Sequence, residues 1–385
     1  MRRMRGTALA AAAMAGVLTL AGCAKDSGGG NSSNNTAAST GGSDCVTAQK
    51  PPAAPAAASS STAAGAKVDG SKLKIGLAFD VGGRGDASFN DAAAAGTDKA
   101  KSDLGVTTVS ESTASASEAE SAKQQRLDQM ASSGLNPIIA VGFAYAPSVK
   151  VVAAKYPNTK FAIVDDDSIT LPNVTPLVFA EEQGSFLVGA AAALKTTACK
   201  IGFVGGVETP LIKKFEAGYI AGAKAVAPNI QVDSKYLTPA GDFTGFNDPA
   251  KATEVARGEL DGGADIIYHA SGASGKGVFE AVAGANTAQS PKWAIGVDSD
   301  QAKTATPPTN ERILTSMLKR VDVAVFDYIN ASAAGNLTTL PKVFDLKVDG
   351  VGYATTGGHV ADIAPQLDAY KAAIIGGQIS VPTSP

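Results

Sequence analysis

The chain has 385 residues, of which 44% are hydrophobic and 18% charged, a globular composition long enough for two α/β domains. Its formal net charge is −3, and Lys and Arg form no basic patch in the sequence. These features argue against nucleic acid as a partner.

The amino terminus indicates a secretory signal. Residues 1–5 carry positive charge, and an apolar stretch follows them up to Leu20. The tetrapeptide Leu-Ala-Gly-Cys that ends at Cys23 resembles a bacterial lipobox, which implies cleavage before this cysteine and its lipidation. An ordinary signal peptide and an amino-terminal anchor are the alternatives. We therefore expect residues 1–22 to be a lipoprotein signal peptide.

The next segment has the composition of a linker. Residues 23–69 are mostly Ser, Gly, Asn, Ala, Thr and Pro. They cannot bury enough apolar surface to offset the entropy cost of ordering. We expect a lipidated, flexible linker that holds the folded body at the extracytoplasmic face of the cell membrane. No second apolar run is long enough to predict a transmembrane helix in the mature chain.

The sequence contains three cysteines, Cys23, Cys45 and Cys199. If Cys23 is lipidated, two remain in an oxidising compartment. A disulfide between Cys45 and Cys199 is one hypothesis and two free thiols is the other, because a sequence gives no Cα distances.

Strand-like and helix-like segments alternate from residue 73 onward. An apolar strand at 73–79 leads through a glycine-rich turn into a helix at 91–105. The following predicted elements are strand 106–110, helix 117–134, strand 136–143, helix 146–157, strand 159–167 and strand 173–183. This alternation predicts a parallel sheet with helices on both faces.

A second series of the same kind follows a helix at 184–198, so we expect two similar α/β units in tandem. Its predicted elements are strand 200–210, helix 211–228, strand 230–237, helix 246–263, strand 264–272, helix 275–288, strand 292–300, strand 313–318 with a helix up to 335, and a closing helix within 353–377.

Polar and aromatic side chains gather at the carboxyl ends of the predicted strands, the edge at which open α/β sheets bind ligands. These residues are Asp80, Asp86, Phe89, Asn90, Asp165, Gly272, Asp298 and Asp300, with Phe246 on a further loop. Carboxylates accept hydrogen bonds from hydroxyls, Asn donates and accepts, and aromatic rings stack. The set therefore suits a polyhydroxylated ligand with a flat ring. The alternative is that several of the aspartates only cap helices.

Catalytic motifs are missing from the sequence. It contains no G-x-x-x-x-G-K-[ST], H-E-x-x-H, C-x-x-C or G-x-S-x-G. Of the two histidines, His269 follows an apolar strand, which favours a role in the core or at a domain contact. The pairs Asp80/Asp86 and Asp298/Asp300 offer oxygen ligands but match no EF-hand. We expect no metal, no cofactor and no enzymatic activity.

The chain carries the motifs DVGGRGDASFN, KFAIVD, FAEEQGSFLVGAAAA, FNDPAKATEVA, IGVDSDQ and LTSMLKRVDVAVFDY in this order. This series, across residues 73–330, resembles the basic membrane protein (BMP) family of ABC-transporter substrate-binding lipoproteins, which are purine nucleoside receptor A-like. The resemblance implies a two-lobed type I periplasmic-binding-protein fold. In this fold each lobe is a parallel sheet flanked by helices, and three hinge strands join the lobes.

The resemblance also implies where the lobes begin and end. The expected amino-terminal lobe comprises residues 70–179 and 300–317, and the carboxy-terminal lobe comprises residues 180–299 and 318–385. The expected crossings between the lobes lie near residue 180, near Asp298–Gln301 and near Lys319.

Several roles in the binding of a purine base are implied. By the resemblance, Phe89 stacks on the base with Phe246 as the opposing ring, although Phe243 competes for that place. Asn90 and Asp165 hydrogen-bond the base edge, and the two aspartates that follow Asp165 compete with it.

The remaining implied ligand contacts concern the sugar and the backbone. Asp298 and Lys319 hold the ribose hydroxyls, Asp80 lies near the site, and Gly272 allows a close backbone approach.

The resemblance implies an extracytoplasmic solute-binding lipoprotein of an ABC importer. Its partners would be a purine nucleoside, an ABC permease and, through Cys23, the membrane; we expect a monomer that binds no nucleic acid. The alternatives are a binding protein for a sugar or another small metabolite, a ligand-sensing surface lipoprotein, and a nucleoside hydrolase.

Overall fold

The computed structural model describes residue 51 and residues 68–385. The predicted signal peptide, Cys23, Cys45 and nearly all of the predicted linker lie outside these residues. Within the described ranges, no helix is both long enough and apolar enough to cross a membrane.

The first lobe contains a five-stranded parallel sheet with the strand order β2-β1-β3-β4-β5. Its strands are β1 (Lys74–Phe79), β2 (Thr108–Thr113), β3 (Ile138–Ala140), β4 (Phe161–Val164) and β5 (Val174–Leu177), and its connecting helices are α1 (Phe89–Leu104), α2 (Glu120–Ser132) and α3 (Ala146–Lys155). β2 begins two residues later than predicted, because this edge strand is polar and carries no apolar pattern that marks its start.

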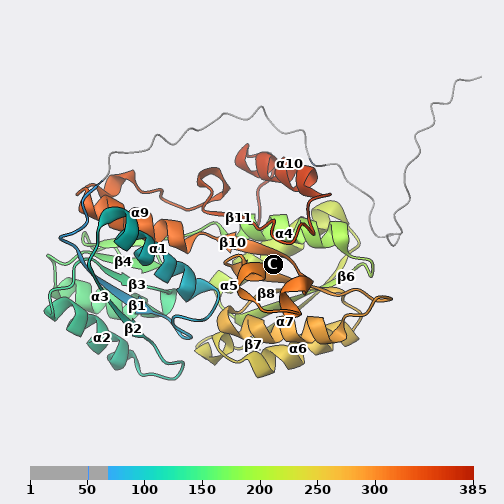
Figure 1. The fold of residues 1–385 in the computed structure, drawn as a ribbon, viewed down its shortest axis with the longest axis horizontal. Coiled ribbons are helices and arrows are strands. Elements are labelled where there is room, and N and C mark those ends of the chain that lie inside the picture. Colours follow the sequence, from blue (N-terminus) through green and yellow to red (C-terminus); the bar gives the residue numbers. More distant parts are fainter. Residues whose placement is uncertain (1–50, 52–67) are drawn as a thin grey trace, which may run out of the picture. The chain divides into compact units, whose positions relative to one another are not determined.

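The first sheet is covered on both faces. Ile75, Leu77 and Phe79 of β1 belong to the core that also holds residues of α1, whereas Ala78 points into a separate core with Leu127 of α2. Figure 1 shows α1 and α2 on opposite sides of this sheet. Burial on both faces explains why β1 is almost entirely apolar.

The second lobe contains a six-stranded sheet with the order β11-β10-β9-β8-β6-β7, in which β11 alone is antiparallel to its neighbour. Its strands are β6 (Lys200–Val207), β7 (Gln231–Thr238), β8 (Ile266–Ala270), β9 (Trp293–Asp298), β10 (Ile313–Lys319) and β11 (Val351–Tyr353). Its helices are α4 (Glu181–Lys195), α5 (Pro210–Val226), α6 (Pro249–Asp261), α7 (Gly275–Ala285), α8 (Gln301–Thr304) and α10 (Ala364–Ile375). Two α/β units in tandem are thus confirmed.

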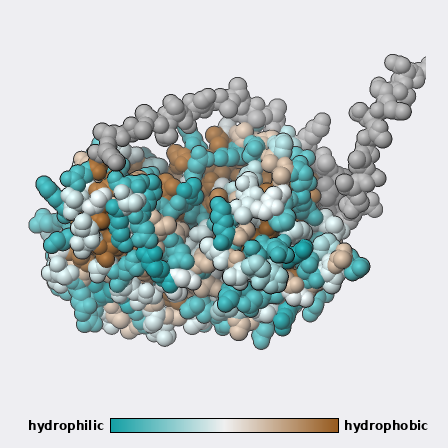
Figure 2. Space-filling model, in the orientation of Figure 1, coloured by the Kyte–Doolittle hydropathy of each residue, from teal (hydrophilic) through white to brown (hydrophobic). Residues whose placement is uncertain are grey.

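On the face seen in Figure 2, hydrophilic side chains cover most of the described surface.

The predicted lobe boundaries are wrong in two places. β10 pairs with β9 in the second sheet, so residues 313–317 belong to the second lobe. Helix α9 (Val321–Ala333) lies against α1 in the first lobe (Figure 1). A Cβ atom at Gly96 would lie 2.6 Å from the carbonyl oxygen of Asp322, so the two helices meet backbone to backbone. An alternating sequence pattern does not say which sheet a strand joins or which lobe a helix covers, since long-range packing decides both.

The crossings between the lobes follow from this arrangement. The chain passes into the second lobe near Phe179, returns between Lys319 and Val321, and passes back near Phe344. The first and third crossings run side by side, because Phe179 and Phe344 form a parallel bridge. The crossing predicted near Asp298–Gln301 is wrong: the chain goes on from β9 to β10 within one sheet.

Helices α4 and α5 pack tightly together in the second lobe. A Cβ atom at Gly222 of α5 would overlap the carbonyl oxygen of Phe186 in α4. This close approach fixes the amino-terminal ends of both helices, which carry Glu181 and Phe215, beside the carboxyl end of β10.

Candidate functional site

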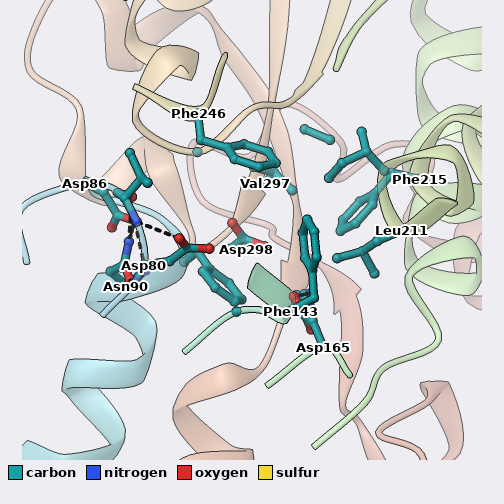
Figure 3. A pocket seen from close by; sticks show the side chains of 17 residues that line it. Asp80, Asp86, Asn90, Phe143, Asp165, Leu211, Phe215, Phe246, Val297 and Asp298 are labelled. Carbon is teal, nitrogen blue, oxygen red and sulfur yellow. Dashed lines mark hydrogen bonds and ion pairs between the residues drawn. The ribbon is translucent and has the colours of Figure 1, made fainter. Parts of the chain in front are cut away.

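A cavity of about 560 Å³, which includes the solvent-open space at its mouth, lies between the carboxyl ends of strands from both lobes. We call it the interlobe cavity. The residues that line it are Asp80, Val81, Asp86, Phe89, Asn90, Gly142, Phe143 and Asp165 from the first lobe, and Leu211, Ile212, Phe215, Phe246, Ala270, Gly272, Val297, Asp298 and Lys319 from the second. All eight ligand-binding residues predicted from the sequence are among them. Figure 3 shows Asp80, Asp165, Asp298 and the surrounding rings.

Asn90 braces the junction between β1 and α1. Its side-chain oxygen accepts a hydrogen bond from the Asp80 backbone N–H at 3.0 Å. Its side-chain nitrogen donates to the Val81 carbonyl at 3.2 Å and to Asp86 Oδ2 at 3.0 Å (Figure 3). Both amide hydrogens are therefore in use, and a hydrogen bond from Asn90 to a ligand requires one of these partners to be exchanged.

Asp86 caps helix α1. Its carboxylate accepts hydrogen bonds from the backbone N–H groups of Ser88, Asn90 and Asp91 at 2.8–3.0 Å. Burial nevertheless raises its pKa above the ordinary value. The capping role that the sequence offered as an alternative is thus the one that Asp86 performs.

Lys319 lies at the centre of a buried ion cluster. Its Nζ is 2.7 Å from Asp165 Oδ2 and 3.2 Å from Glu181 Oε1, and all three side chains are at most 4% exposed. Burial lowers the pKa of Lys319, but the charges of Asp165, Glu181 and Asp298 outweigh that effect, so its pKa stays above the ordinary value. Lys319 is thus a permanent cation, and Asp165 Oδ1 has no hydrogen-bond partner among the described residues.

Three aromatic rings surround the same ammonium group. The Nζ of Lys319 lies 5.1 Å from the ring centre of Phe89, 5.1 Å from that of Phe179 and 5.5 Å from that of Phe215. Each distance is within reach of a cation–π attraction. The Lys319 ammonium group therefore lies beside rings from both lobes.

Three carboxyl groups of the cavity have raised pKa values. Burial raises the pKa of Asp80 to about 6, that of Asp165 to about 6 and that of Asp298 to about 7. Asp298 accepts a hydrogen bond from Ser88 Oγ at 2.6 Å, which partly opposes the effect of burial. Each group needs hydrogen-bond donors to be stable in its ionised form.

The backbone turns two of these aspartates at the ends of their strands. Asp165 follows β4 with a φ of 70°, and Asp298 ends β9 with a φ of 62°. Residues other than glycine seldom adopt this left-handed conformation, and such strain is concentrated at functional sites.

The aromatic lining differs in part from the sequence prediction. Phe246 lines the cavity, whereas Phe243 packs edge to face on Phe143 with ring centres 5.9 Å apart. Phe143 and Phe215 also line the cavity, and neither is predicted from the sequence. Phe215 lies on α5 with Leu211 and Ile212, a spacing that looks like an ordinary core stripe. Figure 3 shows Leu211 and Phe215 on the side opposite Asp86 and Asn90.

Gly272 has a left-handed backbone with a φ of 56°, and a Cβ atom there would lie 3.2 Å from the Phe246 carbonyl oxygen. The chain segment that presents Phe246 therefore packs closely on Gly272, and the close approach of Gly272 to a ligand stays a prediction.

The structure also shows where His269 and Asp300 lie. His269 is fully buried, and burial lowers its pKa to about 4, so it is neutral. Asp300 lies outside the cavity lining and accepts a hydrogen bond from Thr356 Oγ1 at 2.6 Å. Across the part of the chain that the structure describes, no group of three or more His, Cys, Asp or Glu side chains is placed to hold a metal ion.

Cys199 is disulfide-bonded. It is the one cysteine within the described residues, so the predicted partner Cys45 lies outside them and the pairing stays a prediction.

Comparison with known proteins links the fold to a family. The family model described as "ABC transporter substrate-binding protein PnrA-like" matches residues 72–384. A Lactococcus lactis protein named "ABC transporter nucleoside-binding protein BmpA" is 31% identical over 328 residues, which cover 81% of this chain and 89% of the relative. An uncharacterized lipoprotein of Pyrococcus abyssi is 34% identical over 314 residues, which cover 79% of this chain and 75% of the relative.

Among solved structures, an ABC transporter solute-binding protein from Aeropyrum pernix K1 has a similar fold. The two share 27% sequence identity with a TM-score of 0.68, and the match covers 81% of this chain and 93% of that one.

Proposed function

This chain belongs to the PnrA-like family of ABC transporter substrate-binding proteins, and we propose that it binds a purine nucleoside in the interlobe cavity. The family consists of solute-binding proteins and not of enzymes. As a component of an ABC transporter, the protein works with a membrane permease and a small-molecule ligand. The Lactococcus lactis relative is named for nucleoside binding, which supports the ligand class.

The observation that carries the proposal is the combination of rings and acceptors in one cavity. Phe89 and Phe246 line it from different lobes, and Asp80, Asp165 and Asp298 line the same cavity with carboxyl groups. Rings suit the faces of a purine base, and carboxylates suit the N–H groups of its edge and the hydroxyls of ribose.

The charge of the cavity favours a nucleoside over a nucleotide. Four aspartates line it, and Lys319, already paired with Asp165, is the only cationic residue that lines it among the described residues. A phosphate group would enter a site with several acceptors and no free cation. We therefore propose that uncharged nucleosides bind and that their phosphates do not.

We further propose that the protein is a lipoprotein anchored through Cys23 at the extracytoplasmic face of the cell membrane and acts as a monomer. The lipobox-like segment supports this location, and the Pyrococcus abyssi relative is named a lipoprotein. The linker before residue 70 would then connect the anchor to the lobes.

Calorimetric titration of the purified protein with adenosine, inosine, guanosine, ribose and adenosine 5′-monophosphate tests the ligand. We expect saturable binding of at least one purine nucleoside at micromolar concentration or below and none of the monophosphate. Phe89→Ala should abolish the heat, and Phe326→Ala, a ring outside the cavity lining, should not. Binding of ribose alone would replace the proposal with a sugar ligand.

A further inference from the structure

The two lobes are hydrogen-bonded to each other beside the cavity, away from the three crossings. Ser88 Oγ donates to Asp298 Oδ2 at 2.6 Å, and Ser299 Oγ donates to the Ser88 carbonyl at 3.1 Å. Gln301 Nε2 donates to the Ala87 carbonyl at 3.1 Å. We call these five residues, Ala87, Ser88, Asp298, Ser299 and Gln301, the interlobe clasp.

Gln301 has its amide orientation fixed from the second lobe. Its oxygen accepts from the Val297 backbone N–H at 2.8 Å, which can only be a donor. The Nε2 of His269 is 2.9 Å from the same oxygen and must therefore carry the hydrogen, while Nδ1 of this ring lies 3.2 Å from Ser271 Oγ. Because the oxygen is held on this side, the NH₂ group of Gln301 has to face the first lobe.

Gln301 is also held through its own backbone. Its N–H donates to Ser316 Oγ of β10 at 3.1 Å, and the residue is 3% exposed. The side chain thus connects β8 and β9 to a loop of the first lobe, and the backbone N–H ties the residue to β10. Each of these polar atoms of Gln301 already has a protein hydrogen-bond partner, so the residue does not need a hydrogen bond to water.

Two of the residues that Gln301 contacts lie close in sequence to predicted ligand-binding residues. Ala87 leads through Ser88 into Phe89, and Val297 precedes Asp298. The loop at Ala87 has an unusual backbone, with a φ of 55° at Ala87 and a φ of −146° with a ψ of −116° at Ser88. A loop in such a conformation needs external contacts to keep it in place.

We propose that Gln301 is a positioning residue for ligand binding: through the interlobe clasp it sets Phe89 of the first lobe against Asp298 of the second. This inference rests on the proposed function, because it concerns the same cavity. Gln301 does not itself line the cavity, so it acts through the residues that it holds. The clasp makes the geometry of the ring and the carboxylate depend on each other.

The substitution Gln301→Met, which keeps the length of the side chain and removes its hydrogen bonds, tests the proposal. We expect backbone hydrogen exchange in residues 85–91 to become faster without ligand. We also expect dissociation of radiolabelled adenosine to become roughly tenfold faster, the effect of losing one or two buried hydrogen bonds, with association changed by less than about threefold. A merely structural defect would lower the amount of active protein and leave the dissociation rate of the rest unchanged.

Two further variants keep the test decisive. Ser299→Ala removes one bond of the clasp from a half-buried side chain and should give a smaller change of the same kind, about threefold in dissociation, even if Gln301→Met does not fold. Gln366→Met on the exposed side of α10 is the matched control and should change neither measurement.

Unchanged exchange in residues 85–91, or faster exchange with an unchanged dissociation rate, would overturn the proposal. If the unsubstituted protein bound no purine nucleoside, the proposed function would fail separately. Faster exchange in the first-lobe loop of Gln301→Met would in that case still support the clasp.

Discussion

The two walls of the interlobe cavity are built differently. The first-lobe wall carries most of the polar side chains, and the β1–α1 junction that forms much of it is held by hydrogen bonds between its own backbone and the side chains of Asn90 and Asp86. The second-lobe wall is mainly apolar, with Leu211, Ile212 and Phe215 on α5. Its charged groups, Asp298 and Lys319, both pair with groups of the first lobe.

This difference indicates that the two walls contribute to ligand recognition in different ways. A rigid wall of acceptors selects the hydrogen-bonding pattern of a ligand, and an apolar wall supplies contact area with little directional demand. Since Asp298 and Lys319 of the second wall each have a partner in the first lobe, both walls lose contacts when the lobes separate. Substitutions in the two walls should therefore have different effects.

Removal of the central cation should have the largest effect. Lys319→Met leaves Asp165 and Glu181 buried without their partner, and we expect the free energy of unfolding to fall by about 3–5 kcal/mol. Urea denaturation measures this loss. Lys303→Met, at a side chain that is 68% exposed and paired with Asp300, is the control and should cost less than about 1 kcal/mol. Equal losses for the two variants would show that the cluster does not join the walls.

Removal of the brace in the first wall should come next. Asn90→Ala leaves the Asp80 N–H and the Val81 carbonyl without their partners, at a cost of about 2–3 kcal/mol in the free energy of unfolding. Nucleoside affinity should fall as well, because Phe89 is the adjacent residue. Asn336→Ala, which removes an exposed local cap, is the matched control in the same denaturation experiment. An Asn90→Ala protein of normal stability would mean that the first wall is not held from within.

Phe246, an aromatic residue of the second wall, should affect ligand binding more than stability. Phe246→Ala removes one stacking surface, and we expect nucleoside affinity to fall by about 2 kcal/mol, or roughly 30-fold. Phe243→Ala, three residues before Phe246, outside the cavity lining and packed on Phe143, should change affinity less than threefold. Titration calorimetry compares the two. A larger effect of Phe243→Ala would assign the opposing ring to that residue.

The smallest effect is expected for a change of one pH unit. The pKa of Asp298 is about 7 in the folded protein against an ordinary 3.8, so the folded state holds its proton more tightly than the unfolded state. The stability that this group contributes is therefore complete below its ordinary pKa and is lost as the pH rises through about 7. Relative to Asp298→Asn, the unsubstituted protein should lose up to about 1.4 kcal/mol per pH unit between about pH 5 and 7.

Urea denaturation of both proteins at several pH values measures that difference. His269 and Glu259, whose pKa values are also shifted, are present in both proteins, so their contributions cancel in the comparison. Parallel stability curves would show that Asp298 is ionised throughout.

The sequence was sufficient to find the cavity because polar residues at strand ends are visible in it. Asp80, Asp165 and Asp298 each end an apolar strand, and parallel strands bring their carboxyl ends to one edge. Phe215 was missed because an apolar helix residue looks the same whether it faces the core or a ligand. The brace formed by Asn90 was also invisible, since a sequence does not show which backbone groups an amide contacts.

The boundaries of the lobes also could not be predicted from the sequence. β10 and α9 are adjacent in the sequence yet belong to different lobes. Local pattern identifies each as a strand or a helix, but the choice of lobe depends on contacts such as that between Gly96 and Asp322, which are more than 200 residues apart.

The position of α9 has a consequence for how the protein is made. The ribosome completes β1–β5 and α1–α3 long before it reaches residue 321, so α1 remains without its covering helix while β6–β10 of the second sheet are being synthesised. A fragment that ends at the first crossing exposes the apolar face of α1. The amino-terminal half can therefore complete its packing only after α9, a segment from the carboxy-terminal part of the chain, has been synthesised.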